Sequence, residues 1–415
     1  MILPEHENSA MAAIEPWLAI VGIGEDGVEG LTAKARGLIE GAALVVGGKR
    51  HLQLAESLIR GEAMAWTSPI ADTIPILLAR RDSPVAVLAS GDPFYFGVGS
   101  KLARHVPAAE MIVVPQVSSL ALAAGRLGWS QPDVETVTLC GRPLETIRPR
   151  LCDGARLLVL SAGADTPAEV AAYMTQHGFG PSRLHVLEAI GGPYERCRTT
   201  TAAGFDLAEI GPLNLIGAEV EAKAGVRSLP CVPGRSEDWF ENDGQITKAE
   251  IRAITLASLS PAPEETLWDI GCGSGSVSIE WLLACPLAKA VAVDRRRDRL
   301  DRAGRNAAAL GVPRLDLREG TAPEVFAALP APNAVFLGGG AGDPAVLVGA
   351  WNALPTGGRL AANAVTLETQ AALSDAFQRH GGRLTRIAIE RLEPVGSMHG
   401  FRPAMTVLHY AATKP

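Results

Sequence analysis

Three glycines and a downstream carboxylate form the sharpest chemical pattern in the chain. Gly271, Gly273 and Gly275 stand between the apolar stretch "TLWDI" and the helix-forming stretch "SVSIEWLLA". Asp294 ends the next apolar stretch, 19 residues after the last of these glycines (294 − 275 = 19). A glycine turn between a strand and a helix, followed by an acid that can accept both ribose hydroxyls, is typical of nucleoside binding. The pattern therefore predicts a nucleoside site.

A second glycine cluster near the start of the chain lacks such a partner. Gly22, Gly24 and Gly27 follow the apolar stretch "WLAIV", but the next apolar stretch, "AALVV", ends in Gly47 and Gly48 without an acid. A tight strand-to-helix turn by itself also requires glycine. A nicotinamide site and a purely structural turn are therefore both open interpretations of this loop.

Strands and helices must hold these residues in place. Short apolar runs bounded by Gly or Pro alternate with helix-like stretches over 17–128 and again over 129–227, which predicts an α/β domain of two subdomains. The segment 228–244 carries Pro, Gly and acids without periodicity and is predicted to be a linker. Seven apolar runs within 245–415 predict a doubly wound, seven-stranded sheet. Residues 1–16 are interpreted as a tail.

Composition excludes some classes of function. A net charge of −7 disfavours a general nucleic-acid binder, whose affinity rests on neutralising phosphates. No apolar run reaches the roughly 18 residues of a membrane span. The six cysteines form no CxxC pair, so we expect reduced thiols, a cytoplasmic location and no metal site.

The later glycine loop, Asp269-x-Gly271-x-Gly273-x-Gly275, resembles that of class I S-adenosylmethionine (SAM) methyltransferases. The resemblance implies a Rossmann-like fold in which Asp269 meets the ammonium group of SAM and the methionine carboxylate lies near a helix N-terminus. It also implies that Thr247 and a turn near the adenine contribute to the site. That turn is Gly320, Thr321 and Ala322.

The stretches "VGIGEDG", "SGDPFYFGVG" and "VPQVSSLALAAGRLGW" resemble the tetrapyrrole (corrin/porphyrin) methylases. In that fold SAM occupies the cleft between two α/β subdomains. The resemblance assigns cofactor binding to Gly91, Asp92, Pro93, Tyr95, Ser118 and Ser119. It turns the opening glycine loop toward the tetrapyrrole, so that Gly22, Gly24 and Gly27 become substrate contacts.

The fusion of these two halves resembles the bifunctional decarboxylating methyltransferases of cobalamin biosynthesis. The resemblance implies that the N-terminal domain methylates carbon 5 of a precorrin. It also implies that the C-terminal domain methylates carbon 15 and removes the carboxyl group of the ring C acetate, and that the two domains together convert precorrin-6B to precorrin-8. It implies two SAM molecules per reaction, no metal, no nucleic-acid or membrane partner, and a homo-oligomer, either a dimer or a tetramer.

Four further features are candidates for substrate contact. Amine methylases usually carry an Asn/Asp-Pro-Pro-aromatic turn where this chain has Gly338, Gly339 and Gly340, and glycines leave room for a large flat ring. Arg142 and Arg402 are candidates for binding substrate carboxylates, with surface ion pairs as the alternative. His399 is the candidate proton donor for decarboxylation, with a solvated loop histidine as the alternative.

Three alternative functions stay open on the residues alone. Class I domains of this type also resemble tRNA adenine methylases, although the acidic composition and the absent Pro-Pro turn argue against RNA. A nicotinamide oxidoreductase could use the first glycine loop. A SAM-binding scaffold without catalytic activity would carry the same loops.

Overall fold

The computed structural model describes residues 16–415 and divides into two compact units. Of the described residues, unit 1 comprises those up to Arg142 together with Cys152–Val226, and unit 2 comprises Pro143–Leu151 and Arg227–Pro415. The predicted tail, residues 1–16, lies outside the described residues except for its last position. No helix within 16–415 combines the length and the apolar character needed to cross a membrane.

The first sheet of unit 1 is fully parallel and has the order β3-β2-β4-β1-β5. Its strands are β1 (Leu18–Ile23), β2 (Leu44–Gly47), β3 (Glu62–Ala65), β4 (Val85–Ser90) and β5 (Met111–Val114). The helices between them are α1 (Ala33–Glu40), α2 (Lys49–Leu54), α3 (Ile74–Leu78) and α4 (Gly99–Leu102). Strands β1, β2 and β4 are almost entirely buried, as their continuous apolar runs predict. The half-exposed β3 has no such run and was not predicted.

The second sheet of unit 1 is mixed and has the order β6-β7-β10-β8-β9. Its strands are β6 (Glu135–Thr138), β7 (Arg156–Leu160), β8 (Arg183–Glu188), β9 (Arg196–Thr201) and β10 (Asn214–Glu219), and its helices are α5 (Ser119–Leu127) and α6 (Thr166–Gln176). Helix α5 is capped at both ends by its terminal residues: the Ser118 hydroxyl accepts from the Ala121 amide, and Gly128 ends the helix with a φ of 67°.

Unit 2 contains the predicted doubly wound, seven-stranded sheet, in the order β13-β12-β11-β14-β15-β19-β16. Its strands are β11 (Thr266–Ile270), β12 (Lys289–Asp294), β13 (Asp316–Glu319), β14 (Ala334–Leu337), β15 (Arg359–Ala364), β16 (Arg383–Ile387) and β19 (Val407–Thr413). Only β19 runs antiparallel to its neighbours within this sheet. Two separate clusters of buried side chains cover its two faces.

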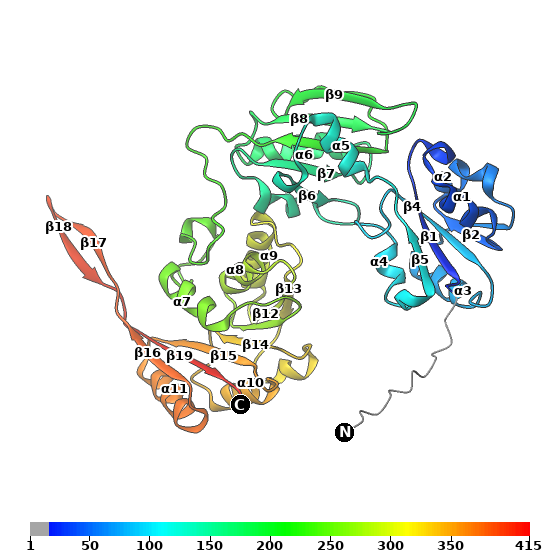
Figure 1. The fold of residues 1–415 in the computed structure, drawn as a ribbon. Coiled ribbons are helices and arrows are strands. Elements are labelled where there is room, and N and C mark those ends of the chain that lie inside the picture. Colours follow the sequence, from blue (N-terminus) through cyan, green and yellow to red (C-terminus); the bar gives the residue numbers. More distant parts are fainter. Residues whose placement is uncertain (1–15) are drawn as a thin grey trace, which may run out of the picture. The chain divides into compact units, whose positions relative to one another are not determined.

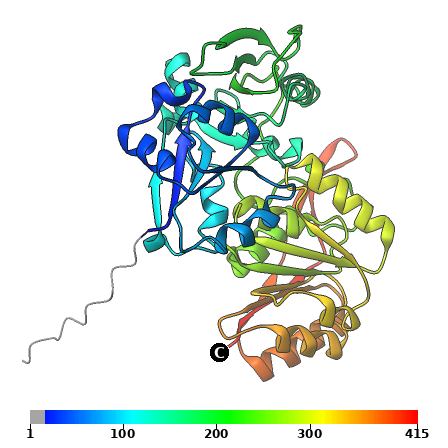
Figure 2. The same ribbon diagram turned by 90° about the vertical axis from the view of Figure 1, so that its right-hand side faces the viewer.

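The helices of unit 2 flank this sheet on both sides (Figure 2). They are α7 (Ala249–Leu259), α8 (Ser276–Ala284), α9 (Arg297–Ala309), α10 (Pro344–Ala353) and α11 (Leu367–His380). Helices α7, α8 and α9 contribute to one apolar cluster, and α10 and α11 contribute to the other. Because β11 pairs in parallel with β12 and β14, the carboxyl ends of these three strands meet at one edge of the sheet, where a ligand site is expected.

The segment predicted as a linker, 228–244, is instead packed into unit 2. Leu229 and Phe240 belong to one of its apolar clusters, and Arg235 is buried. The backbone amides of Gly234 and Arg235 donate to the carboxylate of Glu280 on α8, at 2.7 and 2.9 Å. Composition could not indicate this packing, because the partner residue lies about 45 positions further along the chain.

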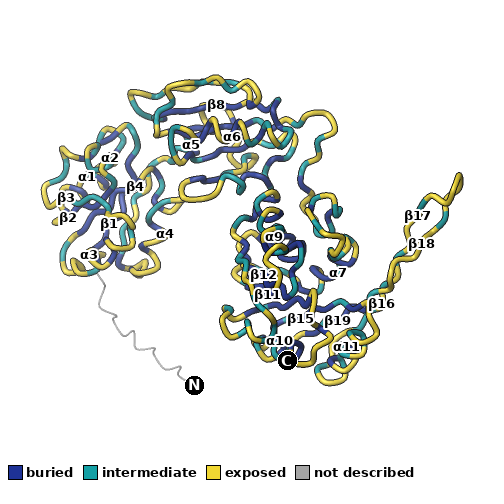
Figure 3. Tube along the Cα trace, turned by 180° about the vertical axis from the view of Figure 1, so that it is seen from behind, coloured by how far each residue is buried: buried dark blue, intermediate teal, exposed yellow. Residues whose placement is uncertain are grey.

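A hairpin that the sequence did not predict follows β16. The stretch "LTRIAIERLEP", read as one strand, divides into β16 and β17 (Glu390–Val395), and β17 pairs with β18 (Met398–Pro403). Within unit 2 the hairpin projects away from the end of the sheet (Figure 1). Most of its residues are exposed (Figure 3), so the pattern of burial that identifies core strands is missing.

Candidate functional sites

A cavity of about 400 Å³ lies within unit 1. Its lining includes the loop after β1, the loop after β4, the start of α5, the end of β8 and the start of β10. Five of the predicted site residues line it, namely Gly24, Gly91, Tyr95, Ser118 and Ser119. The structure therefore gathers part of the predicted cofactor loop and part of the opening glycine loop at one cavity.

Gly91 explains how the loop after β4 approaches α5 so closely. Its φ is 51°, and a Cβ at this position would lie 2.8 Å from the Cα of Ser118. Asp92 and Pro93 do not line the cavity. They shape the loop instead: the Asp92 carboxylate accepts from the Phe94 amide at 2.8 Å, and the Pro93 carbonyl accepts from the Gly99 amide at 2.8 Å.

Two glycines of the opening loop have a packing role and do not line the cavity, so their predicted contact with substrate stays a prediction. Gly22 is buried in β1, and a Cβ there would lie 1.9 Å from the carbonyl oxygen of Gly91. Gly27 is buried and adopts a φ of 57° at the start of a 3₁₀ turn. Only Gly24 of the three reaches the cavity wall. The backbone fit between β1 and the loop after β4 is what requires Gly22.

Aromatic and aliphatic side chains form most of the remaining wall. Tyr95 and Phe96 are about half exposed at 45% and 44%, and the Tyr95 hydroxyl is hydrogen-bonded to the Thr136 hydroxyl at 2.8 Å. Aliphatic residues on the wall are Leu122, Leu160, Leu187, Ile190 and Leu215. Such a surface suits a large, flat, mainly apolar ligand with a few polar anchors.

Four polar residues of this cavity were missed from the sequence. Glu25, Arg50, His51 and Ser90 lie together on its wall. Burial, and secondarily the charge of Arg50, lowers the pKa of His51 to about 4. Ser90 ends β4 and His51 follows β2, so the two meet only because these strands are neighbours in the sheet, which no local sequence pattern marks.

The glycine loop of unit 2 has the geometry that its spacing predicts. Gly271, Gly273 and Gly275 have φ values of 73°, 57° and 74°, which favour glycine. The Gly273 amide donates to the Asp294 carboxylate at 3.1 Å, so the loop and the acid of β12 are in direct contact. A Cβ on Gly271 would lie 2.8 Å from the backbone nitrogen of Gly339.

Asp269 is a buried carboxylate with one oxygen still available. Its Oδ2 accepts from the amide and the hydroxyl of Ser278 at 3.1 and 2.7 Å, while its buried Oδ1 has no hydrogen-bond partner. Burial raises the pKa of Asp269 to about 6, with a smaller contribution from the charge of Asp294. A buried acceptor without a donor fits an ammonium group such as that of SAM, which would supply the missing bond.

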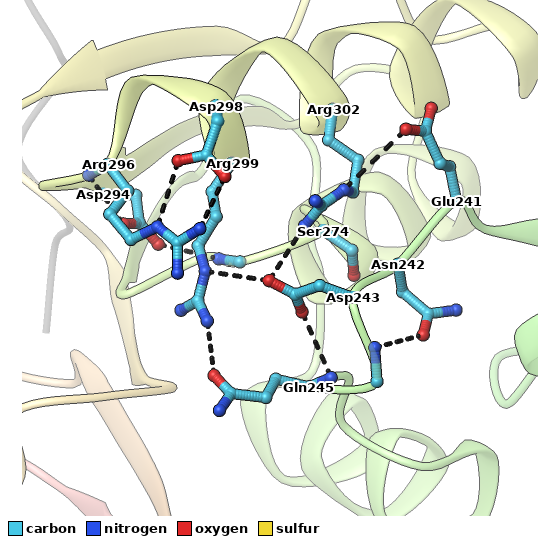
Figure 4. Close-up of polar contacts among 12 residues, drawn as sticks. Glu241, Asn242, Asp243, Gln245, Ser274, Asp294, Arg296, Asp298, Arg299 and Arg302 are labelled. Carbon is cyan, nitrogen blue, oxygen red and sulfur yellow. Dashed lines mark hydrogen bonds and ion pairs between the residues drawn. The ribbon is translucent and has the colours of Figure 1, made fainter.

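The segment 241–245 crosses α9 beside this loop (Figure 4). The Asp243 carboxylate forms ion pairs with Arg299 and Arg302 at 3.3 and 3.1 Å, and the Gln245 side chain accepts from Arg299. The Gln245 carbonyl would lie 3.6 Å from a Cβ on Gly273. Predicted cofactor residue Thr247, two positions further on, is thereby kept near the glycine loop.

The remaining predicted residues of unit 2 fall into two groups. Gly320 donates from its amide to the Asp294 carbonyl at 3.1 Å, which places the turn containing Thr321 and Ala322 beside the acid. The amides of Gly338 and Gly339 both donate to the Ile270 carbonyl, at 2.9 and 3.1 Å. These glycines and Gly340 are exposed at the carboxyl edge of the sheet. An acceptor pocket here remains a prediction.

Within unit 1, Arg142 does not line the cavity, and within unit 2, His399 and Arg402 lie on the hairpin that projects away from the sheet (Figure 1). Arg142 is exposed at the boundary of unit 1 and does not line its cavity. His399 and Arg402 lie on the exposed hairpin, where Arg402 forms an ion pair with Glu393 at 3.0 Å. The surface ion pair and the solvated histidine, the alternatives stated for these two residues, describe their positions better.

Comparison with known proteins matches both halves of the chain. Residues 18–206 match the family model of tetrapyrrole (corrin/porphyrin) methylases, and residues 238–414 match a precorrin methyltransferase domain. A solved structure titled as the C-terminal domain of precorrin-6Y C5,15-methyltransferase from Rhodobacter capsulatus is 45% identical, with a TM-score of 0.43. It covers 45% of this chain and 100% of that chain.

Full-length relatives decide the family. The precorrin-6Y C(5,15)-methyltransferase [decarboxylating] of Sinorhizobium sp is 50% identical over 412 residues, covering 99% of this chain and all of the relative. The protein of the same name from Mycobacterium tuberculosis (strain CDC 1551 / Oshkosh) is 38% identical over 402 residues, covering 96% of this chain and all of the relative. The chain belongs to the family of precorrin-6Y C(5,15)-methyltransferases (decarboxylating).

Proposed function

We propose that this chain uses SAM to methylate a precorrin at carbons 5 and 15 and to remove the carboxyl group of the ring C acetate in cobalamin biosynthesis. The observation that carries the proposal is the identity of 50% to a precorrin-6Y C(5,15)-methyltransferase over essentially the whole of both chains. Two distinct glycine loops, one in each unit, support a division of the two methylations between the units.

Unit 1 carries the methylation of carbon 5 in this proposal. SAM supplies an electrophilic methyl group. The residues at the cavity hold and orient the reactants: Gly91 allows close backbone approach, and Tyr95 and Phe96 offer flat surfaces to a macrocycle. Proximity and orientation of this kind contribute roughly 7–11 kcal/mol to lowering a barrier, so no nucleophilic side chain is needed for the methyl transfer.

Unit 2 carries the methylation of carbon 15 and the decarboxylation. Asp294 would accept the ribose hydroxyls of SAM, and the unpartnered Oδ1 of Asp269 would accept from its ammonium group. A protonated, conjugated macrocycle can take up the electron pair left by the departing carboxyl group, so we propose a reaction without a metal. We also propose that the reaction uses two SAM molecules per precorrin and that the protein is a homo-oligomer.

The alternative functions find less support. A nicotinamide site would require an acid after β2, where the chain has Gly47, Gly48 and then the basic residues Lys49 and Arg50. An RNA methyltransferase and a scaffold without activity both conflict with full-length similarity to precorrin methyltransferases.

Single substitutions in the full-length protein test each of the two sites separately. Replacing Gly24 with leucine puts a bulky side chain into the cavity of unit 1, and replacing Asp294 with alanine removes the ribose acceptor of unit 2. With precorrin-6B and SAM, Gly24→Leu is expected to abolish methylation at carbon 5 alone. Asp294→Ala is expected to abolish methylation at carbon 15 alone, in an assay that supplies a precorrin that unit 1 can methylate at carbon 5. Equal loss at both carbons in either variant would contradict the division between units.

A further inference from the structure

Four polar side chains meet on one wall of the cavity in unit 1. The Glu25 carboxylate, from the opening loop, forms an ion pair with Arg50. Arg50 Nη2 lies 3.0 Å from His51 Nε2 and donates to Ser90 Oγ at 3.1 Å. His51 Nε2 lies 2.8 Å from Ser90 Oγ. Ser90 immediately precedes Gly91, so its hydroxyl adjoins the loop predicted to bind SAM.

The donors and acceptors of this cluster fix the direction of its hydrogen bonds. A guanidinium group can only donate, so His51 Nε2 must accept from Arg50 and carries a lone pair. The ring proton is then on Nδ1, which is buried without a partner. Ser90 accepts from Arg50 and can donate its own proton to His51 Nε2. The result is a hydroxyl that faces the cavity and has a neutral imidazole acceptor behind it.

The reaction assigned to this unit needs such a proton acceptor. When a methyl group replaces the hydrogen of a methine carbon, the carbon first gains the methyl group and must then lose its proton. This step rests on the proposed function, because it presumes that the cavity of unit 1 methylates carbon 5. Among the described residues lining the cavity, Ser90 with His51 is the pair in which a hydroxyl contacts an imidazole.

We propose that Ser90 removes the proton from carbon 5 after methyl transfer, with His51 as the positioning residue that receives the hydroxyl proton of Ser90. The carbon–hydrogen bond breaks and its electron pair returns to the conjugated macrocycle. The proton passes to Ser90 Oγ while the original hydroxyl proton passes to His51 Nε2. The imidazolium then releases its proton to water in the cavity, which restores the pair.

The charges around His51 suit a transient acceptor. Burial and the adjacent Arg50 lower its pKa to about 4, so the imidazole is neutral at neutral pH and keeps its Nε2 lone pair. The same neighbours favour rapid release of the proton afterwards. The Glu25 carboxylate, paired with Arg50, offsets part of the charge that Arg50 presents to His51. A methylated cationic macrocycle is a strong carbon acid, and a weak base is sufficient for it.

The experiment compares Ser90→Ala, Ser90→Thr and His51→Gln in the full-length protein, with precorrin carrying hydrogen or deuterium at carbon 5. Loss of the acceptor should lower kcat for carbon 5 methylation by about 10²-fold, since general base catalysis contributes roughly 10²–10⁴-fold. Deuterium should slow Ser90→Ala and His51→Gln but not the unaltered protein, because proton removal becomes rate-limiting only in these variants. Ser90→Thr keeps the hydroxyl and should retain most of the rate.

Matched controls separate this role from a structural one. His105→Gln changes an exposed histidine of the same unit and should leave rate and isotope effect unaltered. Calorimetry should show unchanged SAM affinity in Ser90→Ala. NMR titration of the free protein should give His51 a low pKa that rises only in part when Arg50 is replaced, because burial is the larger cause. Loss of SAM binding together with the rate would indicate a structural role and overturn the relay.

Two further outcomes are distinguishable. If Ser90→Ala and His51→Gln methylate carbon 5 at the normal rate without an isotope effect, the relay is wrong and the proposed function stands. If the unaltered protein methylates no precorrin at carbon 5, the proposed function of unit 1 is wrong and the relay falls with it.

Discussion

Replacing Glu280 with glutamine tests whether a buried carboxylate on α8 holds the segment 228–244 in place within unit 2. The Glu280 side chain has no exposed surface. It accepts from two backbone amides of the segment and forms ion pairs with Arg252 at 2.9 Å and Arg235 at 3.8 Å. Both guanidinium groups are almost completely buried, with side-chain exposures of 0% and 2%.

The expected cost follows from what glutamine cannot replace. It keeps the shape of glutamate but loses the charge, and one of its two terminal atoms becomes a donor facing other donors. Two buried cations then share no counter-charge, and breaking a buried pair of this kind costs about 3–5 kcal/mol. That is a large part of the roughly 5–15 kcal/mol that stabilises a typical domain. Glu280→Gln should therefore leave unit 2 marginally stable.

Hydrogen–deuterium exchange along a urea series measures this in the full-length protein, because peptides report each unit separately. Peptides of unit 2 should lose protection at markedly lower urea in Glu280→Gln, while peptides of unit 1 should not change. The control Glu250→Gln removes an exposed carboxylate that pairs with Arg391 and should cost at most about 1 kcal/mol. If the two variants unfold at the same urea concentration, the buried carboxylate does not hold the segment in place.

Three further predictions test the packing and the charges. Gly22→Ala should destabilise unit 1 by about 1–3 kcal/mol or more in thermal unfolding, because the new Cβ would lie 1.9 Å from the Gly91 carbonyl oxygen; an unchanged melting temperature would contradict this fit. SAM affinity of unit 2 should weaken below about pH 6, where Asp269 gains a proton, and Asp269→Asn should remove this pH dependence in calorimetry. Burial lowers the pKa of His409 to about 4, so the unfolded protein binds the extra proton first as pH falls below 6.5, and stability should decline between pH 6.5 and 4; His409→Gln should flatten that decline in urea titrations.

Local chemistry explains what the sequence could predict. Continuous apolar runs identify buried parallel strands such as β1, β4 and β11. The spacing from Gly275 to Asp294 leaves room for one helix and the strand that follows it. Ser118 and Gly128 mark the ends of α5 because capping is a property of the terminal residues themselves. Each of these signals lies within one or two adjacent elements.

Long-range contacts explain what it could not predict. Glu280 and Arg235 meet through the packing of segments 45 positions apart, and nothing in either local pattern marks them as partners. Ser90 and His51 adjoin because β2 and β4 are neighbours in the sheet, an order that apolar runs do not specify. His399 was predicted to be a proton donor, but it lies on β18 in the exposed hairpin. This hairpin has no buried face, so its sequence lacks the apolar pattern that identifies a strand.

Mass spectrometry of the product can show whether the protein performs both methylations and the decarboxylation. The full-length protein is incubated with precorrin-6B and with SAM whose methyl group carries deuterium. The mass of the product is then measured, and its labelled positions are located by NMR. We expect two labelled methyl groups, at carbons 5 and 15, and the loss of one carbon dioxide from the ring C acetate. A product with a single labelled methyl group, or with both methyl groups and an intact acetate, would contradict it.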